Sequence, residues 1–249
     1  MSDAQFFRFG WRIPFLASSL LVFVGLYVRL KLHETPAFLR ALEKNERVKL
    51  PMLSVFAQHP WTLLLGTFAC AATFLLFYLM TVFTLSWGTT ALAYSRADLL
   101  ILQMLAMLAF AVSIPLSAVL ADRLDPRSVL IVATLCIVLF GLLFAPMFVA
   151  DNKIAVLAFL SLGLFFMGLT YGPLGTAMAE LFPTAVRYTG ASLAFNLAGI
   201  LGASLAPGVA TWLARDYGLH YVGYYLSATA TLTLIAWLLI STRSRTVRT

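Results

Sequence analysis

The stretch from Glu180 to Gly190 reads Glu-Leu-Phe-Pro-Thr-Ala-Val-Arg-Tyr-Thr-Gly and separates two long apolar runs. Each run is long enough to cross a bilayer, which takes about 20 apolar residues in a helix. Pro183 predicts the end of the helix before it, because proline removes a backbone hydrogen bond and clashes with the preceding turn. Thr189 and Gly190 suit the start of the next helix. Since Glu180 and Arg187 flank the turn, we expect a charged hairpin at a membrane surface.

The composition of the whole chain indicates an integral membrane protein. Of its 249 residues, 61% are hydrophobic and 11% are charged, and the mean hydropathy is +0.93. A soluble domain of this size could not bury so much apolar surface. The net charge of +7 does not indicate nucleic-acid binding, because the basic residues lie between apolar runs and form no patch with interleaved aromatics. We therefore expect membrane lipid as a partner, and no nucleic acid.

Seven apolar runs are long enough to be membrane-spanning helices. None shows the strict alternation of a barrel strand, and a helix satisfies its own backbone groups in lipid. The sequence therefore predicts an all-α, polytopic fold. The runs lie near Trp11–Val28, Trp61–Leu85, Leu99–Leu120, Val129–Val149, Ile154–Met178, Ala191–Leu213 and Val222–Ile240.

The Lys and Arg residues fall unequally on the two sides of these predicted spans. Twelve of the 17 lie on one side, which the positive-inside rule assigns to the cytoplasm. We therefore expect a multi-pass cell-membrane protein with its amino terminus outside and its carboxyl terminus in the cytoplasm. The residues on the other side are Arg8, Arg12, Arg96, Lys153 and Arg215.

Two stretches of the chain resemble one family of membrane proteins. Glu180–Gly190 resembles the loop between helices ten and eleven of the major facilitator superfamily, and more narrowly of its metabolite:proton symporter branch. Gly10–Phe15, which reads Gly-Trp-Arg-Ile-Pro-Phe, resembles the start of helix six in the same branch. The resemblance implies the second half of a transporter in a bacterial inner or plasma membrane.

A third stretch resembles the cytoplasmic signature of the superfamily, G-x-x-x-D-R-x-G-R-R, in part. Asp122, Arg123 and Arg127 stand in the pattern, whereas Ala118 and Asp125 replace glycines. An acid at this place can cap a neighbouring helix or hold an arginine. The alternative for this loop is an ordinary hairpin that follows the positive-inside rule.

The resemblance also implies how the chain is divided, with helices six to twelve of the superfamily fold present. Residues 1–30 would be the last helix of the first half, 31–60 a cytoplasmic linker, 61–240 a six-helix bundle and 241–249 a cytoplasmic tail. Glu34–Val48, within the linker, could form a short surface helix, since Glu43 and Arg47 are spaced by four residues. A solvated connector is the alternative.

The function that the resemblance implies is secondary active transport. The complete carrier would take up a small organic acid or a zwitterionic, betaine-like metabolite together with a proton, by alternating access and without a cofactor. Because this chain supplies one wall of the cavity, we expect a missing amino-terminal half as a partner. The alternatives are a non-transporting membrane fragment or interaction subunit, and a membrane-embedded enzyme. The sequence offers no catalytic cluster for an enzyme and no metal-ligand spacing.

The same resemblance assigns roles to five charged residues. Glu180 and Arg187 would join Arg123 or Arg127, near Asp122, in a cytoplasmic network that forms when that side is closed and separates when it opens. Exposed ion pairs contribute only about 0–1 kcal/mol each. Such a network would bias the transport cycle and would not hold the fold together.

A few polar side chains within the runs are candidates for lining a solute cavity near the membrane midplane. Those selected are Tyr78, Gln103, Tyr171 and Asn196. Tyr78 also precedes Thr81 and Thr84 at three-residue intervals, which predicts that the three share one face. Hydrogen bonding between helices and interfacial tyrosine are the alternatives.

Proton coupling lacks an obvious residue in this chain. All ten acids lie in loops or at helix ends, and Asp98 is a distant candidate. The resemblance places the proton-linked charges in the first half of the carrier.

Glycines and a proline predict where helices bend or approach closely. Gly172 and Pro173 should kink their helix, because proline frees a carbonyl one turn back. Gly199 and Gly202 belong to a run rich in small residues that permits close backbone approach to a neighbour.

Overall fold

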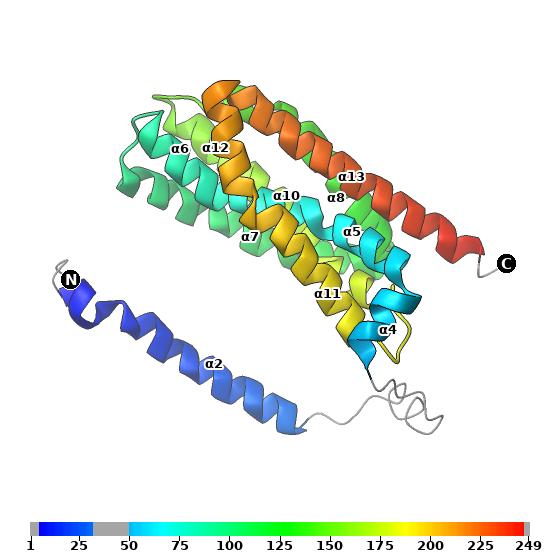
Figure 1. The fold of residues 1–249 in the computed structure, drawn as a ribbon. Coiled ribbons are helices and arrows are strands. Elements are labelled where there is room, and N and C mark those ends of the chain that lie inside the picture. Colours follow the sequence, from blue (N-terminus) through cyan, green and yellow to red (C-terminus); the bar gives the residue numbers. More distant parts are fainter. Residues whose placement is uncertain (1–4, 32–49, 247–249) are drawn as a thin grey trace. The chain divides into compact units, whose positions relative to one another are not determined.

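The computed structural model describes residues 5–31 and 50–246, which form helices joined by turns and contain no strand. The predicted all-α polytopic fold is therefore confirmed (Figure 1). Two compact units divide the chain, Met1–Arg47 and Val48–Thr249. The surface helix predicted for Glu34–Val48 lies outside the described residues.

The first unit contains the π-helix η1 (Phe6–Gly10) and the helix α2 (Arg12–Lys31), and α2 has no buried residue. The hydroxyls of Ser18 and Ser19 donate to the carbonyls three residues earlier, at 2.7 and 2.6 Å. The polar groups of this apolar helix are thus satisfied within it, as a lipid environment requires.

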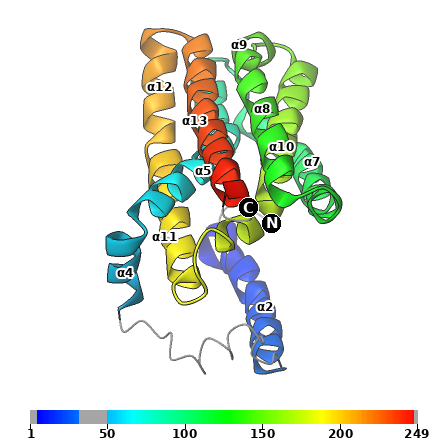
Figure 2. The same ribbon diagram turned by 90° about the vertical axis from the view of Figure 1, so that its right-hand side faces the viewer.

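The second unit is a helical bundle (Figures 1 and 2). Three of its membrane-length segments are α7, α10 and α13, and two more are composite, because a π-helical turn interrupts each of them. The elements in chain order are α4 (Pro51–Gln58), α5 (Pro60–Tyr78), η2 (Leu79–Phe83), α6 (Thr84–Thr90), α7 (Arg96–Arg123), α8 (Pro126–Leu142), α9 (Phe144–Met147), α10 (Lys153–Ala179), α11 (Arg187–Gly199), η3 (Ile200–Ser204), α12 (Ala206–Asp216) and α13 (Leu219–Thr246).

Within the described residues, six helical segments are long and apolar enough to cross a membrane. The fourth predicted run, Val129–Val149, is not one helix: α8 has 17 residues and ends at Leu142, and the four-residue α9 follows. Pro146 explains the break, because it cannot donate to the Leu142 carbonyl and its ring clashes with that carbonyl. The apolar run thus predicted the helix, whose 17 residues lie within the range of about 17–25 for a membrane helix, but not where it ends.

The loop Glu180–Gly190 forms a turn between α10 and α11, as predicted. Helix α10 ends at Ala179, four residues before Pro183, which is where a proline removes the next hydrogen bond. The amide of Val186 donates to the Pro183 carbonyl at 3.0 Å. Helix α11 begins at Arg187, slightly earlier than the predicted start at Thr189.

The bundle is held together by two apolar cores near its opposite ends. The first is rich in phenylalanine, and the rings of Phe144 and Phe159 meet edge to face at 4.8 Å. The second surrounds Trp237, which is fully buried and donates its indole N–H to the Ala69 carbonyl at 3.0 Å. Helix α7 packs along α10, and α13 packs on α8 and α5.

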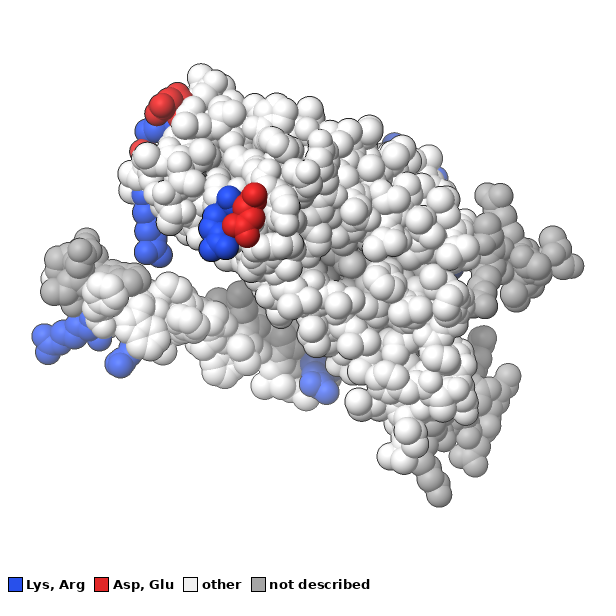
Figure 3. All heavy atoms as spheres, turned by 45° about the horizontal axis from the view of Figure 1, so that its top comes forward, with Lys and Arg blue, Asp and Glu red and all other residues white. Residues whose placement is uncertain are grey.

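Charged side chains are sparse on the face shown in Figure 3, and the acidic ones visible there lie beside basic ones. Ion pairs join Lys153 to Asp98 and Arg215 to Asp216. All four residues lie in the first or last turn of a helix, so these charges fall at the ends of the predicted spans.

Candidate functional site

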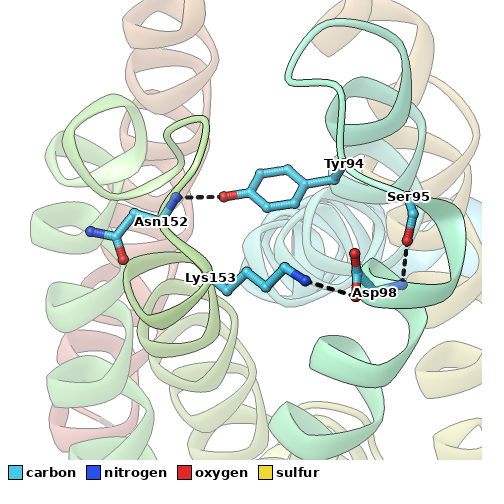
Figure 4. Close-up of polar contacts among 5 residues, drawn as sticks. All are labelled: Tyr94, Ser95, Asp98, Asn152 and Lys153. Carbon is cyan, nitrogen blue, oxygen red and sulfur yellow. Dashed lines mark hydrogen bonds and ion pairs between the residues drawn. The ribbon is translucent and has the colours of Figure 1, made fainter.

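Two loops at one end of the bundle are joined by a set of polar contacts, here called the loop clasp (Figure 4). The Tyr94 hydroxyl donates to the Val149 carbonyl at 3.0 Å and accepts from the Asn152 amide at 2.9 Å. The Lys153 ammonium lies 2.9 Å from the Asp98 carboxylate. Since Tyr94 is buried, the loop clasp ties the start of α7 firmly to the start of α10.

The local sequence explains how these loops enter their helices. The Ser95 hydroxyl accepts from the Asp98 amide at 3.0 Å, and the Asn152 side chain accepts from the Ala155 amide at 2.9 Å, so both residues are helix N-caps. Ala93 and Asp151 have φ angles of 57° and 58°, an uncommon region for residues other than glycine. Sequence reasoning named Asp98 but missed Tyr94. The Ser95-x-x-Asp98 capping pattern was the available signal for the helix start.

Replacing Tyr94 with phenylalanine is expected to lower the free energy of unfolding by about 1–3 kcal/mol, because the part-buried Val149 carbonyl loses its donor and the Asn152 amide loses its acceptor. Asp98→Asn should cost less, about 0–1 kcal/mol, because the ion pair with Lys153 is exposed. Unfolding of the purified chain in detergent, followed by circular dichroism, measures both. A larger loss for Asp98→Asn than for Tyr94→Phe would contradict this ranking.

Gln103 lies in α7, and its side chain hydrogen-bonds to the π turn η2, which lies between α5 and α6. Its side-chain amide donates to the carbonyls of Met80 at 3.0 Å and Thr81 at 2.9 Å, and it also lies 3.2 Å from the Thr84 hydroxyl. Gln103 is 9% exposed. A π turn leaves carbonyls without their usual helical donors, and Gln103 supplies these donors. The structure thus gives Gln103 a contact between helices, the alternative weighed for each cavity candidate.

Gln103→Leu is expected to destabilise the chain by about 1–3 kcal/mol, because the part-buried Thr81 carbonyl loses the Gln103 donor and the Met80 carbonyl keeps only the Thr84 hydroxyl. The matched control is Asn196→Leu, since the Asn196 amide is exposed and bonds only within its own helix, to Ser192. We expect the control to stay within about 0.5 kcal/mol of the parent chain. Equal losses in the two variants, in the same unfolding assay, would show that Gln103 does not brace η2.

A seam of small residues joins α7 to α10. A Cβ added to Gly168 would collide with the Ser113 hydroxyl, and one added to Gly172 would collide with Ser117 and lie 2.9 Å from the Ile114 carbonyl. The two glycines are four residues apart, as are the two serines, so the pairs face each other along both helices. This spacing is the small-xxx-small pattern that lets membrane helices pack closely.

Both helices of the seam contain a proline, Pro115 in α7 and Pro173 in α10. Each proline leaves the carbonyl four residues earlier without its helical donor. Helix α10 nevertheless runs without interruption from Lys153 to Ala179. A kink of α10 at Gly172 and Pro173 therefore remains a prediction. Gly172 itself lets α10 pack closely against Ser117 of α7.

The other glycines selected from the sequence differ from each other. The Cβ position of Gly202 lies 2.7 Å from the Ala71 carbonyl and 2.9 Å from the Leu75 amide nitrogen, so η3 packs directly on the backbone of α5. The Cβ position of Gly199 has no atom within 4 Å. Close packing of η3 against α5 explains why a glycine is needed at position 202, but no such contact explains the glycine at position 199.

The remaining cavity candidates lie on different helices. Tyr78 is half-buried beside Phe77, and Asn196 is exposed. Tyr171 is 44% exposed, and the centroid of its ring lies 6.1 Å from that of Phe110. They are not brought together by any contact within the described chain. Their role in lining a cavity stays a proposal.

The five predicted gating charges lie at the ends of α7, α8, α10 and α11, in the two loops named from the sequence. Asp122, Arg123, Glu180 and Arg187 are exposed, and Arg127 is half-buried. Within the described residues, no ion pair joins the four exposed residues to one another. The Arg187 guanidinium instead donates to the Phe182 carbonyl at 3.3 Å.

Comparison with known proteins gives one consistent result. The sequence model of the Major Facilitator Superfamily matches residues 6–201. An inner membrane metabolite transport protein of Escherichia coli, YhjE, is 47% identical over 244 residues, which is 96% of this chain and 56% of that protein. No solved structure matches.

More distant relatives carry names that specify solutes. The citrate-proton symporter of Salmonella typhi is 32% identical over 85% of this chain and 48% of its own length. A proline/betaine transporter of Salmonella typhimurium is 29% identical over 94% of this chain and 49% of its own length. The chain thus spans about half the length of the curated relatives that it matches.

Proposed function

The chain belongs to the Major Facilitator Superfamily and, within it, to the metabolite:proton symporter family, and on that premise we propose that it forms the second half of a proton-coupled symporter. Its solute would be a small organic acid or a zwitterion. The observation that carries the proposal is the 47% identity to the Escherichia coli metabolite transport protein along 96% of this chain. The names of the citrate and proline/betaine relatives support the two solute classes.

The arrangement of the helices supports transport by alternating access. The loop clasp and the seam fix α7 and α10 as one pair, while the predicted gating charges Asp122, Arg123 and Glu180 are exposed at the opposite ends of these two helices. In the proposed cycle, Glu180 and Arg187 join Arg123 or Arg127, near Asp122, in ion pairs that form when the cytoplasmic side closes and separate when it opens. The positive-inside count supports a cytoplasmic position for this end.

Uptake of labelled citrate, proline and glycine betaine tests the proposal. Cells would express this chain alone, or together with the amino-terminal half of the Escherichia coli relative. We expect saturable uptake, stimulated by an inward proton gradient, when both halves are present. The non-transporting fragment, our second candidate, predicts no uptake in either case although both proteins reach the membrane.

Two variants separate gating from general damage in the same assay. Arg187→Ala and Asp122→Asn should each reduce uptake by about threefold to fivefold, equivalent to at most about 1 kcal/mol in the cycle, as expected for exposed ion pairs. Arg96→Ala is the matched control, because Arg96 is an exposed base at the other end of α7. Uptake that survives in both gating variants would refute the charge network and leave the transport proposal standing.

A further inference from the structure

The end of α12 carries a concave surface, here called the α12 notch, to which neither the sequence motifs nor the relatives assign a role. It has a volume of about 470 Å³ and is lined by Pro207, Gly208, Thr211, Trp212 and Arg215. All five residues lie on α12, so the notch is an open groove on a single helix and not an enclosed cleft. The Cβ position of Gly208 has no atom within 4 Å, so the notch is open where this glycine lies.

Two opposite charges stand together at the rim of the notch. The Arg215 Nε lies 2.7 Å from one Asp216 oxygen, and Nη2 lies 3.3 Å from the other. Both side chains are solvent-accessible, at 72% and 36%. An anion that binds near Arg215 is repelled by the adjacent Asp216 carboxylate, and a cation that binds near Asp216 is repelled by the Arg215 guanidinium. A zwitterion can place each of its charges against the opposite one.

Aromatic rings flank this pair of charges. Trp212 and Tyr217 are about half exposed, at 49% and 53%, and their rings meet edge to face at 5.5 Å. The Trp212 side chain also interacts with the Asp216 carboxylate. An exposed aromatic face attracts an ammonium group, and tryptophan does so most strongly. The cation-attracting groups, Trp212 and Asp216, are therefore adjacent.

We propose that the α12 notch binds a small zwitterion, with the carboxylate at Arg215 and the ammonium on the exposed face of the Trp212 ring, near Asp216. The proposal rests on the proposed function, because it places a recognition site for the zwitterionic solute class at the end of the bundle that the positive-inside count predicts to face outward. Exposed ion pairs are weak, so a ligand can displace part of the Arg215–Asp216 contact at small cost. The competing explanation is an interfacial belt, in which tryptophan and tyrosine contact lipid headgroups generally.

Ligand-observed NMR on the full chain in phosphatidylglycerol nanodiscs tests the site with three probes of similar shape. Trimethylglycine carries both charges, 3,3-dimethylbutanoate only the carboxylate, and choline only the ammonium. We expect trimethylglycine to bind at least about tenfold more tightly than either singly charged probe. Arg215→Gln should remove most of this preference, and Trp212→Leu should weaken trimethylglycine binding about threefold to fivefold. The controls are Arg96→Gln and Trp61→Phe, which change an exposed arginine and an exposed tryptophan elsewhere.

The outcomes separate this inference from the proposed function. Equal binding of the three probes, or losses equal to those of the controls, would overturn the zwitterion site and favour the interfacial belt. Weaker trimethylglycine binding in phosphatidylcholine nanodiscs would support the site and identify a lipid headgroup as an occupant. Binding at the notch without uptake in the two-half assay would support the site while the transport proposal fails. Uptake of betaine without binding at the notch would overturn the zwitterion site and support the transport proposal.

Discussion

Trp237→Ala is expected to lower the free energy of unfolding by about 3–5 kcal/mol, the largest loss among the stability variants considered. Trp237 is fully buried, and its indole N–H donates to the Ala69 carbonyl at 3.0 Å. In a membrane the loss comes from missing packing contacts and from the lost indole hydrogen bond, since lipid tails are as apolar as the core. Chemical unfolding in detergent, followed by circular dichroism, measures it.

Trp61→Ala is the control for this prediction, because Trp61 is 52% exposed at the start of α5. We expect it to change the free energy of unfolding by no more than about 0.5 kcal/mol. Similar losses in the two variants would mean that the core around Trp237 is not tightly packed.

Gly168→Leu is expected to be the next most damaging change, at about 3 kcal/mol, because it overpacks the seam between α7 and α10. The Cβ position of Gly168 collides with the Ser113 hydroxyl and lies 3.0 Å from the Phe110 carbonyl, which belongs to a helix backbone and cannot easily move. The helices must therefore separate. The same unfolding assay applies, and uptake in the two-half assay should also fall.

Gly175→Leu controls for the change of residue type in the same helix. The Cβ position of Gly175 has no atom within 4 Å, so a side chain there meets open space. Because glycine is a poor helix former, this variant should be neutral or more stable by about 0.5–1 kcal/mol. A loss as large as that of Gly168→Leu would argue against the seam.

The sequence predicted most helices because their signals are local. An apolar run of sufficient length, a capping residue and a proline each act within a few residues, and Ala179 ends α10 where Pro183 requires. Pro146 gave the same kind of signal and was overlooked within the apolar run Val129–Val149. The hairpin at Glu180–Gly190 was predicted correctly for the same local reason.

The candidate site could be predicted only in part, because its contacts depend on neighbouring helices. Tyr78, Thr81 and Thr84 were predicted to share a face from their regular spacing; Thr84 is fully buried and the other two are half-buried. Nothing in the sequence indicated η2, the π turn that lies between α5 and α6 at this place. Gln103, 22 residues after Thr81, supplies the hydrogen bonds that stabilise this turn, and no local pattern reveals that partner. Tyr94 was missed for a similar reason.

The π turns have a consequence for how this membrane bundle can change length during evolution. A π turn is a helix with one additional residue, so η2 and η3 mark positions where a one-residue deletion would restore a regular α-helix. The helical segments on both sides would keep their packing faces, whereas a deletion elsewhere would rotate everything beyond it by about 100° in a helix of 3.6 residues per turn. Single-residue gaps between homologous sequences should therefore concentrate at residues 79–83 and 200–204.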